Sequence, residues 1–427
     1  MVSDWNEDIL SNIAEIIDSR HKTPVYSDSG YPMVRVVDVN GGALNLESTK
    51  RVSDEVYEDF SRGRDPEVGD LVISRVGSYG VVSYVNSDEK FCLGQNTAFI
   101  IPKINSRFLY YQLISPFVKW QIEQFVVGAV QKTISLKSIR QFQIKLPPEP
   151  EQKAIAHILG SLDDKIELNR QMNETLEAMA QALFKSWFVD FDPVIDNALA
   201  AGNAIPDELL ERAEQRKGFE KKDNSDIQGL FPDEFEFTEE MGWIPKGWGV
   251  GALDNMFELQ RGFDLPKTKR TDGLYPLMAA SGQDGTHYEY KVKGPGVITG
   301  RSGKLGVVSF VNANYWPLNT TLWVKNYNQS NPYHAYFFLQ TLDLEKYNSG
   351  SAVLSLNRNN VHNLVQILPS KIVLDKFQEV VKSSFAKIAE NNTGIETLAK
   401  LRDTLLPKLM SGEVRISDAA ELVDEVL

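Results

Sequence analysis

An internal duplication constrains this chain more than any other feature of its sequence. Residues Arg75 to Val85, RVGSYGVVSYV, recur as Arg301 to Val311, RSGKLGVVSFV, with seven of eleven positions identical. A sparser match aligns residues 128–188 without a gap onto 350–410, at an offset of 222, and both stretches pass through Leu-Pro into a helical pattern. Such a repeat predicts two copies of one structural unit, and duplicated units often recreate a two-fold axis.

The second part of each copy has the heptad spacing of a coiled coil. Apolar residues at alternating steps of four and three run from Ile155 to Trp187, and again from Phe377 to Leu409, as in helices that bury an apolar stripe on each other. Polar residues interrupt both stripes, at Asn169, Asn173 and Asn391. We expect an intramolecular antiparallel coiled coil with Asn173 facing Asn391, whereas a parallel pair would set Asn169 against Asn391.

The length of 427 residues allows two or three domains, and the duplication places them. We predict an α+β protein in which two long helices separate two pseudo-symmetric, β-rich globular domains. The predicted boundaries are 1–150 for the first domain, 151–192 for the first helix, 193–241 for an acidic linker, 242–370 for the second domain, 371–412 for the second helix and 413–427 for a C-terminal tail. Residues 151–188 would span roughly 57 Å as a helix, which suits a spacer.

The net charge of −13 argues superficially against binding nucleic acid, but the charge is unevenly distributed. Residues 193–241 carry 5 basic and 13 acidic groups, whereas residues 242–370 carry 12 basic and 8 acidic groups. The second domain is therefore basic. The Pro, Gly and acidic residues of 193–241 predict a surface linker with solvated charges and a short helix at 206–215.

Several classes of protein and site are disfavoured. The single cysteine, Cys92, excludes an internal disulfide and a thiolate-rich metal site, and its apolar surroundings predict a core position. Because no apolar run approaches ~18 residues and the first residues are acidic, we expect neither a membrane helix nor a secretory signal, and a cytoplasmic location.

Catalytic motifs are also missing from the sequence. Leu146-Pro147-Pro148-Glu149 lacks the residues that flank Pro-Pro in adenine methyltransferases, and Gly303-Lys304 fails the phosphate-binding P-loop pattern. The five histidines are dispersed, and no nucleophile elbow is present. We therefore predict no catalytic residue, no metal site and no cofactor in this chain.

What remains is the repeated Arg-x-Gly-x-x-Gly-Val-Val-Ser segment, whose glycines permit a tight reversal between two strands. Arg75 and Arg301 end the first strands, where a guanidinium could contact a DNA phosphate or a guanine edge, a structural ion pair being the alternative. Asn96-Thr97 aligns with Asn319-Thr320 nearby. The candidate DNA-binding residues are the cations and polar residues on the repeated hairpins, loops and basic cluster: Arg75, Ser78, Tyr79, Lys132, Thr133, Arg261, Lys267, Lys269, Arg270, Arg301, Lys304, Arg358 and Asn359.

This arrangement resembles the DNA specificity subunit of type I restriction-modification systems over nearly the whole chain. The resemblance is carried by the repeated hairpins, by LPPEPEQ at Leu146 to Gln152, by WFVDF at Trp187 to Phe191, by IPKGW at Ile244 to Trp248 and by LLPKLMSGEVRI at Leu405 to Ile416. It implies that each globular domain is a target recognition domain that reads half of a bipartite double-stranded DNA site, while the helices set the gap.

The resemblance also implies partners. The helices would dock two methyltransferase subunits, and restriction or translocase subunits would complete the complex. S-adenosylmethionine, ATP and Mg would then act in those partner subunits, which direct adenine methylation or cleavage. No membrane association is expected.

Two other functions remain open from the residues. The chain could be a coiled-coil scaffold or adaptor whose duplicated domains bind protein or glycan ligands without a DNA role. It could also be a DNA endonuclease acting alone, although no acidic metal cluster recommends this.

Overall fold

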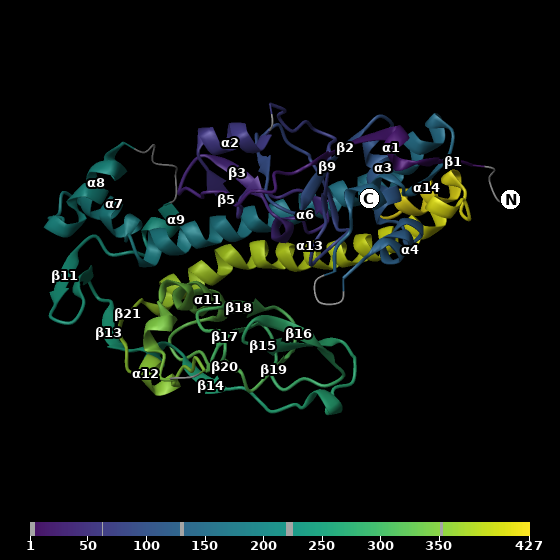
Figure 1. Ribbon diagram of the computed structural model, residues 1–427. Helices are drawn as coiled ribbons and strands as arrows, with labels where there is room; N and C mark the ends of the chain where they lie inside the picture. Colours follow the sequence, from purple (N-terminus) through teal and green to yellow (C-terminus); the bar gives the residue numbers. More distant parts are fainter. Residues whose placement is uncertain (1–4, 62, 129–131, 219–224, 351–352) are drawn as a thin grey trace. The chain divides into compact units, whose positions relative to one another are not determined.

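The computed structural model describes residues 5–61, 63–128, 132–218, 225–350 and 353–427 (Figure 1). The chain divides into two compact units. The first comprises Met1–Arg170 with Asn392–Leu427, and the second comprises Gln171–Asn391. Each unit therefore contains one globular domain and about half of each of two long helices, α6 (Glu149–Phe188) and α13 (Lys371–Ser411).

The first unit is built on three small sheets. The largest has the strand order β2-β9-β6-β7-β4, a second has the order β5-β3-β8, and β1 pairs with β10. The strands are β1 (Asn6–Ile9), β2 (Ala14–Asp18), β3 (Tyr31–Val34), β4 (Gly42–Ala43), β5 (Lys50–Val52), β6 (Leu71–Ser74), β7 (Val82–Tyr84), β8 (Cys92–Leu93), β9 (Thr97–Pro102) and β10 (Gln143–Leu146). The helices are α1 (Leu10–Ile13), η1 (Val36–Asp38), α2 (Asp54–Ser61), α3 (Ser106–Ile114), α4 (Pro116–Phe125), α5 (Leu136–Arg140) and α14 (Ile416–Asp424).

The second unit repeats this plan. Its main sheet has the order β14-β20-β17-β18, the second has the order β16-β15-β19, and β13 pairs with β21. The strands are β11 (Phe235–Thr238), β12 (Gly242–Pro245), β13 (Gly249–Ala252), β14 (Glu258–Arg261), β15 (Tyr275–Ala279), β16 (Gly282–His287), β17 (Gly296–Gly300), β18 (Val308–Val311), β19 (Trp316–Pro317), β20 (Thr321–Asn326) and β21 (Val365–Leu368). The helices are α7 (Asp192–Ala201), η2 (Asp207–Leu209), α8 (Leu210–Lys217), α9 (Ser225–Gln228), α10 (Leu253–Met256), η3 (Lys267–Lys269), α11 (Pro332–Thr341), η4 (Leu344–Tyr347) and α12 (Arg358–His362).

The two domains share strand pairing that sequence identity alone does not reveal. In both, the hairpin predicted from the repeat lies beside a long antiparallel strand, as β6–β7 beside β9 and as β17–β18 beside β20. Both also contain a parallel pair, β3–β8 and β15–β19. An Asn side chain caps the following helix in each copy, Asn105 for α3 and Asn331 for α11. The predicted duplication of an α+β unit is confirmed.

The alignment of the Asn-Thr pairs is wrong by one residue. Thr97 and Thr321 are the structural equivalents, because each begins the long strand and each donates its hydroxyl to a carbonyl three residues earlier, at 2.8 Å. Asn96 thus corresponds to Thr320 rather than to Asn319. Between the hairpin, where the copies are offset by 226, and this strand, where they are offset by 224, the second copy is shorter by two residues, and identity at a single dipeptide concealed the correct alignment.

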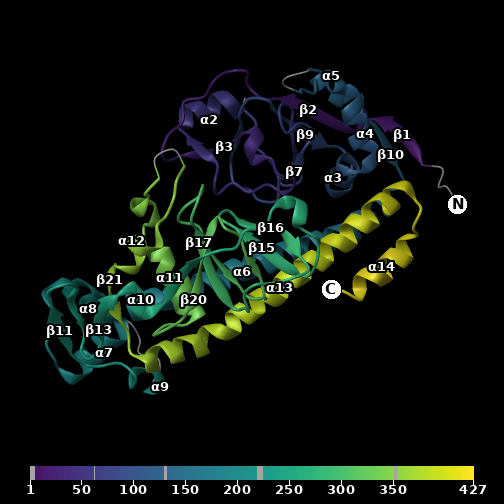
Figure 2. The same ribbon diagram turned by 90° about the horizontal axis from the view of Figure 1, so that it is seen from below.

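The apolar stripes of the long helices point inward, as their spacing predicts. In the first unit, Leu159 and Leu162 of α6 are buried in one core with Leu398 and Leu405 of α13. In the second unit, Trp187 packs on Phe377, with ring centroids 5.9 Å apart. Later residues of α6 therefore meet earlier residues of α13, so the pairing is antiparallel. Within each unit, the halves of the two helices lie side by side (Figure 1, Figure 2).

The predicted register pair is confirmed inside the second unit. The Asn391 amide donates to the Asn173 side-chain carbonyl at 2.8 Å, and Asn391 is buried. In the first unit, Asn169 lies opposite Gly394, where an added Cβ would meet the Asn169 amide at 3.3 Å. The parallel alternative, Asn169 against Asn391, is wrong. A buried Asn pair within an apolar stripe specifies one register, because sliding would leave both amides without partners.

A polar network joins the first domain to both of its helix segments. Tyr111 of α3 donates to Asp163 of α6 at 2.6 Å, and Arg402 of α13 donates to the other Asp163 oxygen at 2.7 Å. Burial opposes the charge of Arg402, but its hydrogen bonds to Asp163 and Asp403 outweigh burial and raise its pKa. Because Tyr111 is fully buried, loss of Asp163 would leave buried polar groups unpaired.

Residues 193–241, which we expected to be a solvated linker, are partly built into the second unit. Val194 and Ile195 of α7 are fully buried, and Asp192 accepts two hydrogen bonds from Arg212 at 2.7 and 2.8 Å. Burial opposes ionisation of Asp192, yet hydrogen bonds from Arg212 and Ser186 lower its pKa. Within 193–241, Asp196 is likewise buried and paired with Arg216, whereas most of the other described acidic residues of this segment are exposed, as predicted. The short helix is present as η2 and α8, and residues 219–224 lie outside the described residues.

The long helices begin and end where the local chemistry requires. The first helix starts at Glu149, two residues before the predicted start at 151, because Pro150 fits a first helical turn. It ends at Phe188, before the predicted end at 192. Phe191 then adopts a left-handed backbone. The second helix ends at Ser411, followed by Gly412 with a φ of 73°. The expected C-terminal tail contains α14, which buries Ala419 and Val423 in the first core.

Two sequence motifs that lie far apart in the chain meet in the core of the second unit. Phe188 and Phe191 of WFVDF pack on Trp248 of IPKGW, with ring centroids 6.2 and 5.8 Å apart. Phe188 also contacts the ring of His334, which is completely buried. Burial lowers the pKa of His334 to about 3, so this imidazole is neutral at physiological pH.

Candidate functional site

The repeated hairpins present the candidate residues on equivalent frameworks. In the first domain, Gly77 and Gly80 have φ values of 70° and 73°, and in the second, Gly303 and Gly306 have values of 88° and 77°. Only glycine adopts this left-handed backbone readily. The predicted tight reversals are confirmed, and they place the residues between the glycines at the tips.

A second repeated segment lies against each hairpin. In the first domain, the Gly77 amide donates to the Lys132 carbonyl at 3.2 Å, and the Ile134 amide donates to the Arg75 carbonyl at 2.9 Å. In the second domain, the Gly303 amide donates to the Leu354 carbonyl at 3.0 Å, and the Leu356 amide donates to the Arg301 carbonyl at 2.8 Å. The two independent sequence repeats therefore form one hairpin-and-loop surface in each domain. Residues 129–131 and 351–352 of these loops are outside the described part of the chain.

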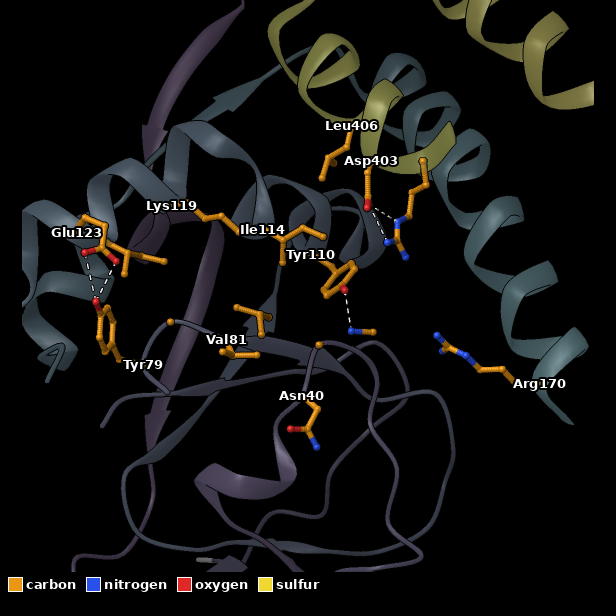
Figure 3. Close-up of a pocket in the computed structure, with 16 residues that line it drawn as sticks. Asn40, Tyr79, Val81, Tyr110, Ile114, Lys119, Glu123, Arg170, Asp403 and Leu406 are labelled. Atoms are coloured by element: carbon orange, nitrogen blue, oxygen red, sulfur yellow. Dashed lines mark hydrogen bonds and ion pairs between the residues drawn. The ribbon is translucent and has the colours of Figure 1, made fainter. Parts of the chain in front are cut away.

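The first hairpin-and-loop surface gathers five candidates: Arg75, Ser78, Tyr79, Lys132 and Thr133. Thr133 bridges to Val76 in the backbone, and the Lys132 ammonium lies 3.4 Å from the Tyr79 hydroxyl and 5.7 Å from its ring centroid. Tyr79 also donates to Glu123 of α4, at 3.0 Å (Figure 3). Ser78 and Lys132 are exposed. That these five residues contact DNA remains a prediction.

Arg75 is held by its own domain. Its guanidinium lies 2.5 Å from Asp18 of β2, and its side chain is only 12% exposed. The geometry matches the structural ion pair that the sequence left as the alternative. Because Asp18 precedes Arg75 by 57 residues, sequence spacing could not identify this partner.

The second hairpin-and-loop surface is more cationic. Lys304 is exposed at the tip, and Arg301 donates to the Asn319 carbonyl at 2.7 Å. Arg261 and Arg358 line one cavity of about 670 Å³, together with Gln260 and Lys325, which sequence reasoning missed. Arg261 and Arg358 thus line the same cavity although they are distant in sequence, and the charge of Arg261 acts on the nearby Arg301.

The remaining candidates extend from this region. Lys267 and Lys269 are exposed on η3, and Arg270 forms an ion pair with Asp284 at 2.7 Å. Arg270 lines a smaller cavity of about 260 Å³ that shares Asp264 with the larger one. Asn359 is exposed in the first turn of α12.

The first unit contains a larger cavity of about 820 Å³ that the sequence did not suggest. Arg170 of α6 and Asp403 of α13 line it together with Tyr110, Asn40 and Lys119 of the first domain (Figure 3). The Tyr110 hydroxyl accepts from the Gly42 amide at 2.8 Å, which fixes the adjacent loop. The Gly41-Gly42 pair, both with positive φ, was the available sequence signal.

Two other kinds of site are absent from the described part of the chain. Within the described ranges, no group of three or more His, Cys, Asp or Glu side chains is placed to hold a metal ion. None of the described helices is long and apolar enough to cross a membrane. Cys92 is fully buried, as predicted, and burial raises its pKa to about 12.

Comparison with known proteins agrees with this architecture. The family model described as the type I restriction modification DNA specificity domain matches residues 2–178. The type I restriction enzyme HindI specificity subunit of Haemophilus influenzae is 27% identical, over 97% of this chain and 100% of its own. The MjaIX specificity subunit of Methanocaldococcus jannaschii is 24% identical, over 97% and 94%.

A solved structure shares the fold. The type I restriction-modification S subunit from M. genitalium superposes with a TM-score of 0.54 at 16% identity, covering 95% of this chain and 96% of its own. The chain is thus similar over nearly its whole length to type I restriction-modification DNA specificity subunits, and the family model covers residues 2–178. The relatives are named as specificity subunits, and the adaptor alternative finds no support in these comparisons.

Proposed function

We propose that this chain reads a bipartite double-stranded DNA target, with the domain at 1–150 recognising one half and the domain at 242–370 the other. The observation that carries this proposal is the repeated hairpin-and-loop surface. Both domains hold it with matching backbone hydrogen bonds, yet its side chains differ. A common framework with divergent side chains suits two related but distinct half-sites.

The charge distribution supports this assignment. The second domain carries an excess of basic groups, and several of its cations surround one cavity. Among the acidic residues of 193–241, Asp196 is paired with Arg216. Because DNA affinity depends on neutralised phosphates, a chain with a net charge of −13 would bind weakly alone, and the partner subunits would supply much of the affinity.

The partners follow from the family. We infer that two methyltransferase subunits dock on the paired helices and that restriction or translocase subunits complete a cytoplasmic complex. S-adenosylmethionine, ATP and Mg²⁺ act in those subunits, where adenine methylation or DNA cleavage takes place. This chain contributes the sequence preference and the distance between half-sites.

Selection from randomised duplexes by the purified complex tests the proposal. We expect enrichment of two short, unlike base blocks separated by a fixed, unspecified gap, because each domain reads its own block. The complex assembled without this chain is the control and should enrich no motif. Enrichment of one continuous block, or of none by the full complex, would contradict bipartite reading.

A further inference from the structure

The two domains differ sharply in charge at one pair of equivalent positions. In the first domain, Asp18 ends β2 and Arg75 follows β6, and the two form an ion pair at 2.5 Å. In the second domain, Arg301 follows β17 at the position of Arg75, because the hairpin repeat aligns them directly. The residue that corresponds to Asp18 can be read from the strand register.

That residue is Arg261. Asp18 pairs with Ala98, the residue after Thr97, and Arg261 pairs with Leu322, the residue after Thr321. Arg75 and Arg301 also occupy equivalent positions beside the central strand. The Arg75 amide donates to the Asn96 carbonyl, and the Arg301 amide donates to the Thr320 carbonyl, both at 2.8 Å. The second domain therefore replaces an aspartate–arginine pair with two arginines.

These two guanidinium groups are not neutralised within the domain. Across the described residues, neither Arg261 nor Arg301 forms an ion pair, and the Arg261 side chain makes no hydrogen bond. Burial and the neighbouring charge of Arg261 lower the pKa of Arg301, which Asp264 only partly offsets. The Asp264 carboxylate instead accepts a hydrogen bond from the Asn319 amide.

The surroundings leave room for an anion. Arg261 lines the cavity of about 670 Å³ together with two more cations, Arg358 and Lys325, and two carboxylates, Glu258 and Asp264. Arg358 makes only a long hydrogen bond, 3.5 Å, to the Leu259 carbonyl, while Lys325 lies 4.0 Å from Glu258. Phosphates are bound in this way by convergent guanidinium groups with free N–H donors.

We propose that Arg261 and Arg301 bind one backbone phosphate of the DNA, at a site that the first domain lacks because Asp18 and Arg75 neutralise each other there. The inference rests on the proposed DNA recognition and deepens it. A phosphate removes the repulsion between two adjacent cations, whereas a neutral base edge does not. The second domain thus contacts the DNA backbone at this position, whereas in the first domain the Asp18–Arg75 ion pair occupies the equivalent arginine.

The Arg261→Asp substitution tests this site by giving the second domain the charge pair of the first. Binding of the whole complex to its target duplex is measured by fluorescence anisotropy over a series of salt concentrations. We expect affinity to fall about tenfold, and the slope of log affinity against log salt to fall by about 0.9, which is one phosphate contact. Base preferences at both half-sites should stay the same, because a phosphate contact carries no sequence information.

Lys293→Asp is the matched control, since it makes the same charge change at an exposed lysine of the same domain that is not a candidate DNA-binding residue. Arg261→Gln provides a second variant without a new carboxylate, and it should weaken binding less than Arg261→Asp. The melting temperature of the Arg261→Asp variant should be at least as high as that of the wild type, because the new carboxylate faces Arg301. Loss of folding in both Arg261 variants would make the residue structural and overturn the site.

Two further results would overturn the phosphate assignment while leaving DNA recognition intact. In the first, the Arg261→Asp variant has the same affinity and the same salt slope as the Lys293→Asp control. In the second, the slope is unchanged but preference at one base is lost, which indicates a base contact. If the wild-type complex itself shows no sequence preference, the proposed function fails, and that outcome is visible before any variant is tested.

Discussion

Removing one heptad from each long helix, residues 170–176 and 388–394, is expected to shorten the gap between the two recognised half-sites and leave their sequences unchanged. The deletion takes out about 10 Å of helix, which corresponds to about three base pairs. Seven residues make nearly two helical turns, so the apolar stripes stay in phase. Each deleted segment contains one member of the Asn173–Asn391 pair. The two amides are therefore removed together, and neither is left without its partner.

The effect on the original target should be large. With one half-site out of reach, its bases no longer contribute to the free energy of binding. The loss resembles that of several mismatched base pairs, each of which costs about 1–3 kcal/mol. Affinity for the original duplex should therefore fall on the order of 100-fold or more, while a duplex with the shortened gap regains it. Selection from randomised duplexes measures both the gap and the half-sites.

A length-preserving variant is the matched control. It replaces exposed residues of the same two heptads with alanine and keeps Asn173, Asn391 and the apolar stripe, and it should retain the original gap. If the double deletion folds and assembles yet selects the original gap, the helices do not measure distance. A change in half-site bases instead of the gap would contradict modular reading in the same way.

Acidification is expected to destabilise the second unit through His334. Its pKa is about 3 in the folded chain because of burial, against an unperturbed value of 6.5. Below pH 6.5 the unfolded chain therefore binds a proton that the folded chain refuses, and stability falls as the pH falls towards 3. The free energy of unfolding should drop by about 3 kcal/mol between pH 7 and pH 4 from this group alone.

The His334→Phe variant isolates this contribution. Phenylalanine is suited to a site already lined by the rings of Phe184, Phe188 and Phe338, and it cannot titrate. Urea unfolding followed by tryptophan fluorescence at pH 7 and at pH 4 should show a shallower pH dependence for the variant, by about 3 kcal/mol. Equal pH dependence in the two proteins would mean that His334 is protonated without cost in the folded state.

The features predicted well from sequence are those that short-range spacing determines. The glycines at 77, 80, 303 and 306 adopt positive φ as the repeat suggested, and the heptad spacing identified the Asn173–Asn391 contact. These patterns depend on which backbone conformations a residue allows and on helical periodicity, both of which the sequence displays directly.

The features missed depend on contacts between residues distant in sequence. Asp18 meets Arg75 across 57 residues, and Asp163 meets Arg402 across 239, so no local pattern connects them. The burial of Val194 and Ile195 was missed because acidic neighbours gave their segment the composition of a linker. Asp192 and Asp196 tolerate burial only because Arg212 and Arg216 pair with them.

The duplication explains why the two domains can differ without loss of the fold. Strand order and hairpin-and-loop contacts recur in both, whereas Asp18 and Arg261 occupy equivalent positions with opposite charge. A substitution at the surface of one copy leaves the framework of the other untouched. Each domain is therefore free to acquire its own DNA contacts while the paired helices stay unchanged.

The most direct test of the central claim is a map of methylated adenines across the source genome, with this gene intact and deleted. If the chain is the specificity subunit of a bipartite system, one gapped motif should lose methylation completely on deletion and regain it on complementation. That motif would give both half-sites and the gap. An unchanged map, in cells where the partner methyltransferase is expressed, would contradict the assignment.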